Sequence, residues 1–156
     1  MERVDRAVAA LLRGGALLVL PLSLLLFVQW PLRDLVQAGS REANDLAQVL
    51  FALYVAMAIT SATRDRSHLA ADLLARRYSA RTRDLISRAG ALFIAVPAAV
   101  FVLVAGAQAT WIATTGLERF PETMNPGYFL VRVAVMVLAA LVLVQALLDL
   151  ARRAPR

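Results

Sequence analysis

The only histidine of the chain, His68, lies in a cluster of charged residues with Asp65, Arg66 and Asp72. A histidine in such surroundings can titrate near neutral pH, bind a lipid phosphate or hold a loop by hydrogen bonds. Catalysis would need a nucleophile or a metal partner, and the sequence supplies neither at a usable spacing. We therefore interpret Arg66, His68 and Asp72 as structural or partner contacts and expect no catalytic set.

Arg132 is a second position of chemical interest, because it is the only charged residue in the apolar run 127–148. A cation in the middle of a span costs about 2.5–3.5 kcal/mol on insertion scales, and less near the surface. Arg132 can avoid this cost by extending outward or by pairing with Glu118 or Glu122 in the preceding loop. A salt bridge to a partner subunit and a contact to substrate are the alternatives.

Metal and redox chemistry are limited by composition, since the chain has no cysteine and one histidine. Without cysteine there can be no disulfide, no iron–sulfur cluster and no thiolate metal site. One histidine cannot supply the paired axial ligands of a membrane b-type haem, and a histidine-rich metal centre is equally excluded. We expect no cofactor and no metal.

The elements that must position these residues are apolar, because 60% of the 156 residues are hydrophobic, more than a soluble core of this size needs. Four runs are close to the ~20 residues with which a helix crosses ~30 Å of hydrocarbon. They predict spans at about 14–32, 46–63, 89–114 and 127–148. Backbone polar groups must be paired in lipid, so we expect an all-α membrane protein with a single membrane domain, 1–156.

The first span is preceded by residues 1–13, whose apolar side chains share one helical face, as in a segment that lies against lipid headgroups. A signal peptide is the competing interpretation, but no A-x-A-like cleavage site follows the apolar run. Pro21 predicts a kink in this span, and Trp30 followed by Pro31 predicts its interfacial end.

Polar residues predict where two further spans begin. Asn44 or Asp45 is expected to cap the second span, and Asn125 with Pro126 is expected to be the N-cap and first residue of the fourth. Small residues recur every four positions in the second span, a spacing that lets another helix come close; the high frequency of alanine in this chain is the alternative explanation. The recurring residues are Ala52, Ala56 and Thr60.

Residues 64–88 form the only long charged interval between apolar runs. Leucines on one side and charges on the others predict an amphipathic helix along the interface between the second and third spans. Ser79 is expected to cap a new helix, with Asp84 and Arg88 paired one turn apart. This helix should continue directly into the third span.

Arginine counts predict the topology. Thirteen of the seventeen arginines fall in the N-terminal segment, the 64–88 interval and the C-terminal tail, whereas four fall elsewhere. Because cytoplasmic segments are enriched in arginine, both termini and the 64–88 interval should be cytoplasmic, an N-in/C-in arrangement. The net charge of +6 is explained by these clusters beside spans, so we expect contacts with membrane lipids and not with nucleic acid.

The central interval resembles a known family. Residues 66–74, RSHLAADLL, are similar to the pattern that follows the second span in the small membrane subunit of TRAP (tripartite ATP-independent periplasmic) transporters, the DctQ type. Residues 78–83, YSARTR, resemble the turn that opens the third helix of that family. Glu42 before the second span and residues 125–128, NPGY, before the fourth also fit, as do the overall length and the four spans.

The resemblance implies a protein of the bacterial inner membrane that has no transport pathway of its own. A large multi-span subunit would carry the substrate and cation sites, and a periplasmic substrate-binding protein would deliver an organic acid such as a carboxylate for import driven by an ion gradient. The small subunit would brace the large one and help dock the binding protein. Seven residues are candidate partner contacts: Arg66, His68, Asp72, Glu42, Glu118, Glu122 and Arg132.

Two other classes compete with this hypothesis. A small four-helix membrane enzyme acting on a lipid or thiol would want clustered arginines and a tyrosine, for which Arg76, Arg77 and Tyr78 are available. A small multidrug exporter would need an acidic residue within a span, and the predicted spans contain none. Polar residues inside these spans include Ser23, Thr60, Gln108, Thr110 and Gln145, each of which a neighbouring helix can satisfy.

Overall fold

A computed structural model describes residues 2–35, 39–64 and 78–151. These residues form helices and no strand: α1 (Glu2–Ala16), α2 (Val19–Leu35), α3 (Arg41–Arg64), α5 (Ala80–Gly90), the π-helical turn η1 (Ala91–Ala95), α6 (Val96–Thr115) and α7 (Phe129–Ala151). Four helical stretches are long and apolar enough to cross a membrane, namely Arg3–Leu35, Arg41–Arg64, Arg81–Thr115 and Phe129–Ala151. For the described residues, the prediction of an all-α protein with four helices long and apolar enough to span a membrane is confirmed.

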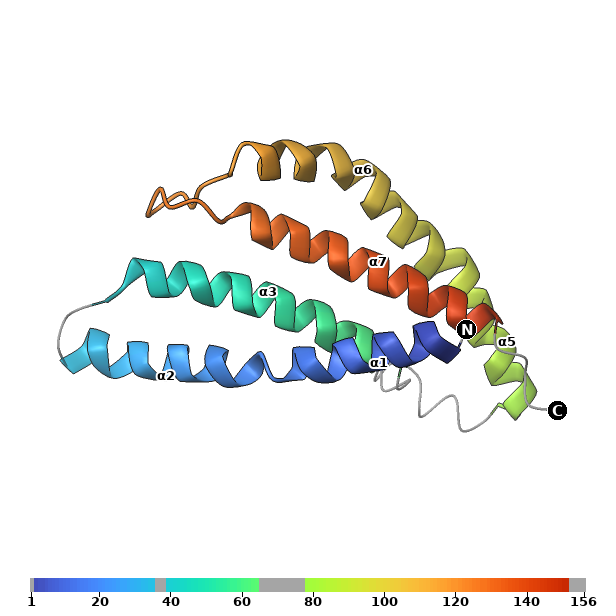
Figure 1. The fold of residues 1–156 in the computed structure, drawn as a ribbon. Coiled ribbons are helices and arrows are strands. Elements are labelled where there is room, and N and C mark those ends of the chain that lie inside the picture. Colours follow the sequence, from blue (N-terminus) through green and yellow to red (C-terminus); the bar gives the residue numbers. More distant parts are fainter. Residues whose placement is uncertain (1, 36–38, 65–77, 152–156) are drawn as a thin grey trace.

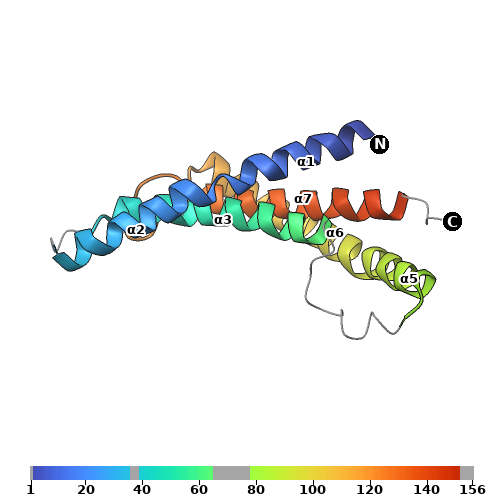
Figure 2. The same cartoon turned by 90° about the horizontal axis from the view of Figure 1, so that it is seen from below.

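The four long helices form an open row (Figure 1). The main contacts join α1 and α2 to α3, α3 to α7, and α7 to α6, so α2 and α6 occupy opposite edges. Seen from below, the α1–α2 rod crosses α3 at an angle (Figure 2). Of the most apolar 18 residues in each stretch, 33% are buried in α7 but 6% in the α5–α6 stretch. The core therefore lies around α7 and α3, and α6 is the least covered.

The two ends of the row differ in content (Figure 1). The end of α2, the start of α3 and the α6–α7 loop lie together at one end, here named the loop end. The beginning of α1, the end of α7 and α5 lie at the other, the terminal end. Both ends of the described chain therefore share one side of the row, as four crossings require.

The first span is interrupted where Pro21 predicts a kink. Leu17 and Leu18 form a turn between α1 and α2. Pro21 has no N–H to donate to the carbonyl of Leu17, four residues back, and Leu20 N donates to that oxygen instead, at 3.1 Å. Pro31, in contrast, does not end the helix as predicted: α2 continues through it to Leu35. A proline removes one backbone hydrogen bond, and membrane helices tolerate this loss.

The second span starts earlier than predicted, because its cap is Ser40 and not Asn44 or Asp45. Ala43 N donates to Ser40 Oγ at 3.1 Å, which satisfies a backbone donor of the first turn of α3. The predicted row of small residues is largely covered: Ala56 and Thr60 are 1% and 0% exposed, and Ala52 is half-buried. Small side chains thus occupy the positions at which α3 is most enclosed.

The third span follows its cap as predicted. Thr82 N donates to Ser79 Oγ at 3.2 Å, and Arg88 Nε lies 2.8 Å from Asp84 Oδ2. The helix runs from α5 through η1 into α6 without a break. The π-helical turn comes directly before Pro97, and its wider winding accommodates a residue that has no N–H. The predicted interfacial helix falls largely on residues 65–77, outside the described part of the chain.

The fourth span begins at Phe129, so the prediction that Asn125 and Pro126 start the helix is wrong. Pro126 instead forms an isolated antiparallel bridge with Arg119. Phe120, 4% exposed, packs edge-on against Tyr128 with ring centroids 5.5 Å apart. The α6–α7 loop thus closes around the buried ring of Phe120 before α7 begins. Residues 125–128 belong to this closed loop and not to the helix.

Candidate functional site

Four of the seven predicted contact residues lie at the loop end, and the structure brings two of them together. Glu42 is in the first turn of α3 and accepts a hydrogen bond from Ser40 Oγ at 3.1 Å. Glu118 and Glu122 are in the α6–α7 loop, and Arg132 is in the first turn of α7. The other three residues, Arg66, His68 and Asp72, lie outside the described residues.

Arg132 is paired within the chain. Its Nε and Nη2 donate to the two carboxylate oxygens of Glu118 at 2.6 and 2.7 Å. The pair is partly open to solvent, with the two side chains 44% and 29% exposed. The hydrogen bond from Arg132 holds the pKa of Glu118 below its ordinary value of 4.5. This arrangement is the intrachain pairing expected from the sequence, with Glu118 and not Glu122 as the partner.

A second link at the loop end was missed by sequence reasoning. Asp45 in α3 is 7% exposed, and its Oδ2 accepts a hydrogen bond from the Thr123 hydroxyl in the α6–α7 loop. Thr123 Oγ1 in turn accepts from Asn125 N at 3.3 Å. Asp45 and Thr123 are 78 positions apart in the sequence, so only the packing of α3 beside α7 brings them together. The available signal was an acidic residue at the edge of a span, which we interpreted as a cap.

Backbone hydrogen bonds fix the α6–α7 loop in one shape. Gly127 N and Tyr128 N both donate to the carbonyl of Glu118, and Phe120 N donates to that of Asn125 at 2.9 Å. Met124 has a φ of 59°, a conformation that a side chain disfavours and that the surrounding bonds must hold. Its side chain is 61% exposed. The loop is therefore a preorganised surface with an apolar tip.

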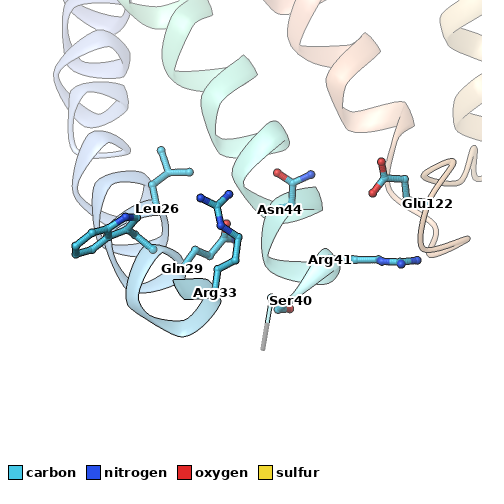
Figure 3. A pocket seen from close by; sticks show the side chains of 9 residues that line it. Leu26, Gln29, Arg33, Ser40, Arg41, Asn44 and Glu122 are labelled. Carbon is cyan, nitrogen blue, oxygen red and sulfur yellow. The ribbon is translucent and has the colours of Figure 1, made fainter. Parts of the chain in front are cut away.

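A cavity of about 520 Å³ opens between α2 and α3 at the loop end (Figure 3). Arg33 lies along α2 near Gln29, and Arg41 extends from α3 toward the loop that carries Glu122. The amide nitrogen of Gln29 is buried and has no hydrogen-bond partner among the described residues. The wall is completed by Leu26, Trp30, Gly39, Ser40 and Asn44. Two guanidinium groups and an unpaired amide make this cavity rich in hydrogen-bond donors.

The interior of the row offers little chemistry. A second cavity, of about 300 Å³, lies between α1 and α3 and is lined mainly by small or apolar side chains: Leu12, Ala16, Tyr54, Met57, Ala58, Ser61 and Ala62. Among residues 2–35, 39–64 and 78–151 no group of three His, Cys, Asp or Glu is placed to hold a metal ion. Thr60 and Gln145, the largest fully buried side chains in these ranges, bond to Ala56 O and Asp149 Oδ1.

One face of the α5–α6 rod is uncovered and aromatic. Phe93, Phe101, Val104 and Trp111 are 70–74% exposed and recur at the spacing of a single helical face. Gln108 lies on the same face, is exposed, and makes no side-chain hydrogen bond within the described chain. An amide among large apolar side chains distinguishes this face from one that only meets lipid.

Comparison with known proteins agrees with this organisation. The family model for the DctQ component of tripartite ATP-independent periplasmic transporters matches residues 22–156, most of the chain. No curated protein and no solved structure matches. Members of that family are components of a transporter and not enzymes, so the membrane-enzyme alternative is set aside. The chain belongs to the DctQ family, the small membrane component of TRAP transporters.

Proposed function

We propose that this chain braces the large membrane subunit of a TRAP transporter in the bacterial inner membrane and helps dock the periplasmic substrate-binding protein. The complex would import an organic acid, such as a carboxylate, with the energy of an ion gradient. The observation that carries this proposal is the open row of spans, which leaves the aromatic face of α6 uncovered. Such a row encloses no pathway of its own and presents an edge to another protein.

The face of α6 supports bracing because of Gln108. At 1.5 Å per residue, Gln108 lies about 10 Å from the end of α6 at Thr115, one turn deeper than Trp111. An amide in hydrocarbon without a partner costs several kcal/mol, whereas one that meets a polar group of another helix does not. We infer that the large subunit covers this face and supplies a partner to Gln108.

The loop end supports docking. Two side-chain links, Asp45 with Thr123 and Glu118 with Arg132, hold the α6–α7 loop against α3 and α7. A surface that is rigid before binding loses less conformational entropy when a partner docks. The arginine asymmetry predicts that this end faces the periplasm, where the binding protein is found.

Co-purification with the large subunit tests this proposal. Phe101→Ala and Gln108→Leu on α6 should lower the yield of heterocomplex, while Phe27→Ala on α2 should leave it unchanged. Phe27 is the matched control, because it is 72% exposed and Phe101 is 71% exposed. Gln108→Leu distinguishes the two environments by the direction of its effect. If position 108 faces lipid, leucine should not lower the yield of heterocomplex, so an undiminished yield would refute the placement of the large subunit on α6.

A further inference from the structure

The cavity between α2 and α3 has more donors than acceptors. Gln29 Nε2 is buried there without a partner in the described chain, although buried amide donors are nearly always bonded. Arg33 uses Nε for Asp34 at 3.2 Å, and no further bond of its guanidinium is found among the described residues. Arg41 has no ion pair within those residues. Both arginines are exposed and can be solvated by water, but together with the buried amide of Gln29 they offer several donors to a ligand with negatively charged oxygens.

The position of the cavity selects the kind of ligand. Trp30 and Leu26 belong to its wall and are 62% and 51% exposed, and both are in a stretch long and apolar enough to cross a membrane. Tryptophan is enriched at the level of lipid headgroups, and arginine side chains donate charge-assisted hydrogen bonds to phosphate oxygens. A phospholipid whose phosphate lies at this level would place its acyl chains beside the exposed apolar side chains of α2.

Glu122 refines the choice, because it is the only acidic residue of the cavity wall and comes from the α6–α7 loop. A carboxylate beside the site disfavours a second negative charge on the ligand. The Glu122 carboxylate can accept hydrogen bonds from a primary ammonium group such as that of ethanolamine, whereas the quaternary amine of choline has no N–H to donate. The other acids nearby are engaged, Asp34 with Arg33 and Glu42 with Ser40.

We propose that this cavity binds the headgroup of an ethanolamine phospholipid. Arg33, Arg41 and the amide of Gln29 hold the phosphate, and Glu122 accepts a hydrogen bond from the ammonium group. The lipid fills the space between α2 and α3 and joins them to the α6–α7 loop.

Native mass spectrometry of the full chain in mild detergent tests the proposal with three defined lipids: phosphatidylethanolamine, phosphatidylglycerol and phosphatidylcholine. The first should be retained best. Arg33→Gln with Arg41→Gln should lower its retention by about tenfold or more, as expected for lost charge-assisted hydrogen bonds. Glu122→Gln should reduce the preference over phosphatidylcholine and leave binding of the phosphate in place. Arg119→Gln is the matched control, because Arg119 is an exposed arginine of the same end that does not line the cavity.

Several results would overturn the proposal. Equal retention of the three lipids, or unchanged retention by the double variant, would show that the cavity does not read the headgroup. If inorganic phosphate is retained as well as phosphatidylethanolamine, the cavity binds a free anion and not a lipid headgroup. If no lipid is retained and the double variant instead loses affinity for the periplasmic binding protein, the cavity holds an acidic side chain of that protein. Should the double variant fail to fold, Gln29→Leu and Arg41→Gln, made singly, provide the same comparison.

Discussion

Thr123 donates a hydrogen bond to the buried carboxylate of Asp45, and this contact joins the α6–α7 loop to the first turns of α3. Nearby, Arg132 of α7 donates two hydrogen bonds to Glu118 of the same loop. A loop that would normally be mobile is therefore fixed at two points. This rigidity is what the proposed docking role requires.

Thr123→Val should destabilise the loop end by about 1–3 kcal/mol, because the Asp45 carboxylate stays buried and loses its donor. Thermal unfolding in detergent measures the change. Thr115→Val is the control, since the Thr115 hydroxyl bonds only carbonyls of its own helix. Equal losses in the two variants would mean that the link to Asp45 contributes nothing particular.

Stability should depend on pH through Glu118. Its pKa is lower in the folded chain than the ordinary 4.5, so the pair with Arg132 contributes fully above about pH 4.5 and is lost as the pH falls through the lower folded value. Glu118→Gln should abolish this loss when unfolding midpoints are compared from pH 7 to pH 3. Glu122→Gln should keep it, because Glu122 has no ion pair among the described residues. An identical pH profile for wild type and Glu118→Gln would contradict the assignment.

The crossing of α1 over α3 depends on the absence of a side chain at Gly15. A Cβ there would lie 2.8 Å from Cβ of Met57, which cannot move without the backbone, and closer still to its Cγ. Gly15→Ala should therefore cost about 1–3 kcal/mol from overpacking. Gly14→Ala, at a neighbouring position with open space, should be neutral or stabilising by up to about 1 kcal/mol. Chemical denaturation of both variants checks the difference, and a neutral Gly15→Ala would show that the helices separate easily.

Arg66, His68 and Asp72 remain a prediction from the sequence. Alanine at each should lower the yield of the complex or its transport rate and leave the substrate preference unchanged. Uptake of several organic acids by the complete system measures both quantities. A shifted preference would place these residues at a substrate site and contradict the scaffold assignment.

Local features were predictable, and long-range ones were not. The spans, the cap at Ser79 and the interruption caused by Pro21 follow from hydrophobic length, from one side chain or from one missing N–H. The link between Asp45 and Thr123 depends on which helices are neighbours. Membrane spans that are apolar all round do not show which face packs, so the order of the row is not readable from their pattern. Asn125 and Pro126 were misread because a cap and first helical residue look the same in sequence as the closure of a loop around Phe120, which the loop's own bridge and ring contact produce.

We propose that this chain completes a transporter and carries no solute by itself. Uptake of a labelled organic acid into vesicles tests this proposal under imposed gradients of sodium and, separately, of protons, with the periplasmic binding protein present throughout. Vesicles with this chain alone should show no uptake above empty vesicles, and vesicles that also contain the large subunit should accumulate the acid. Accumulation by this chain alone would show that it has a transport pathway of its own.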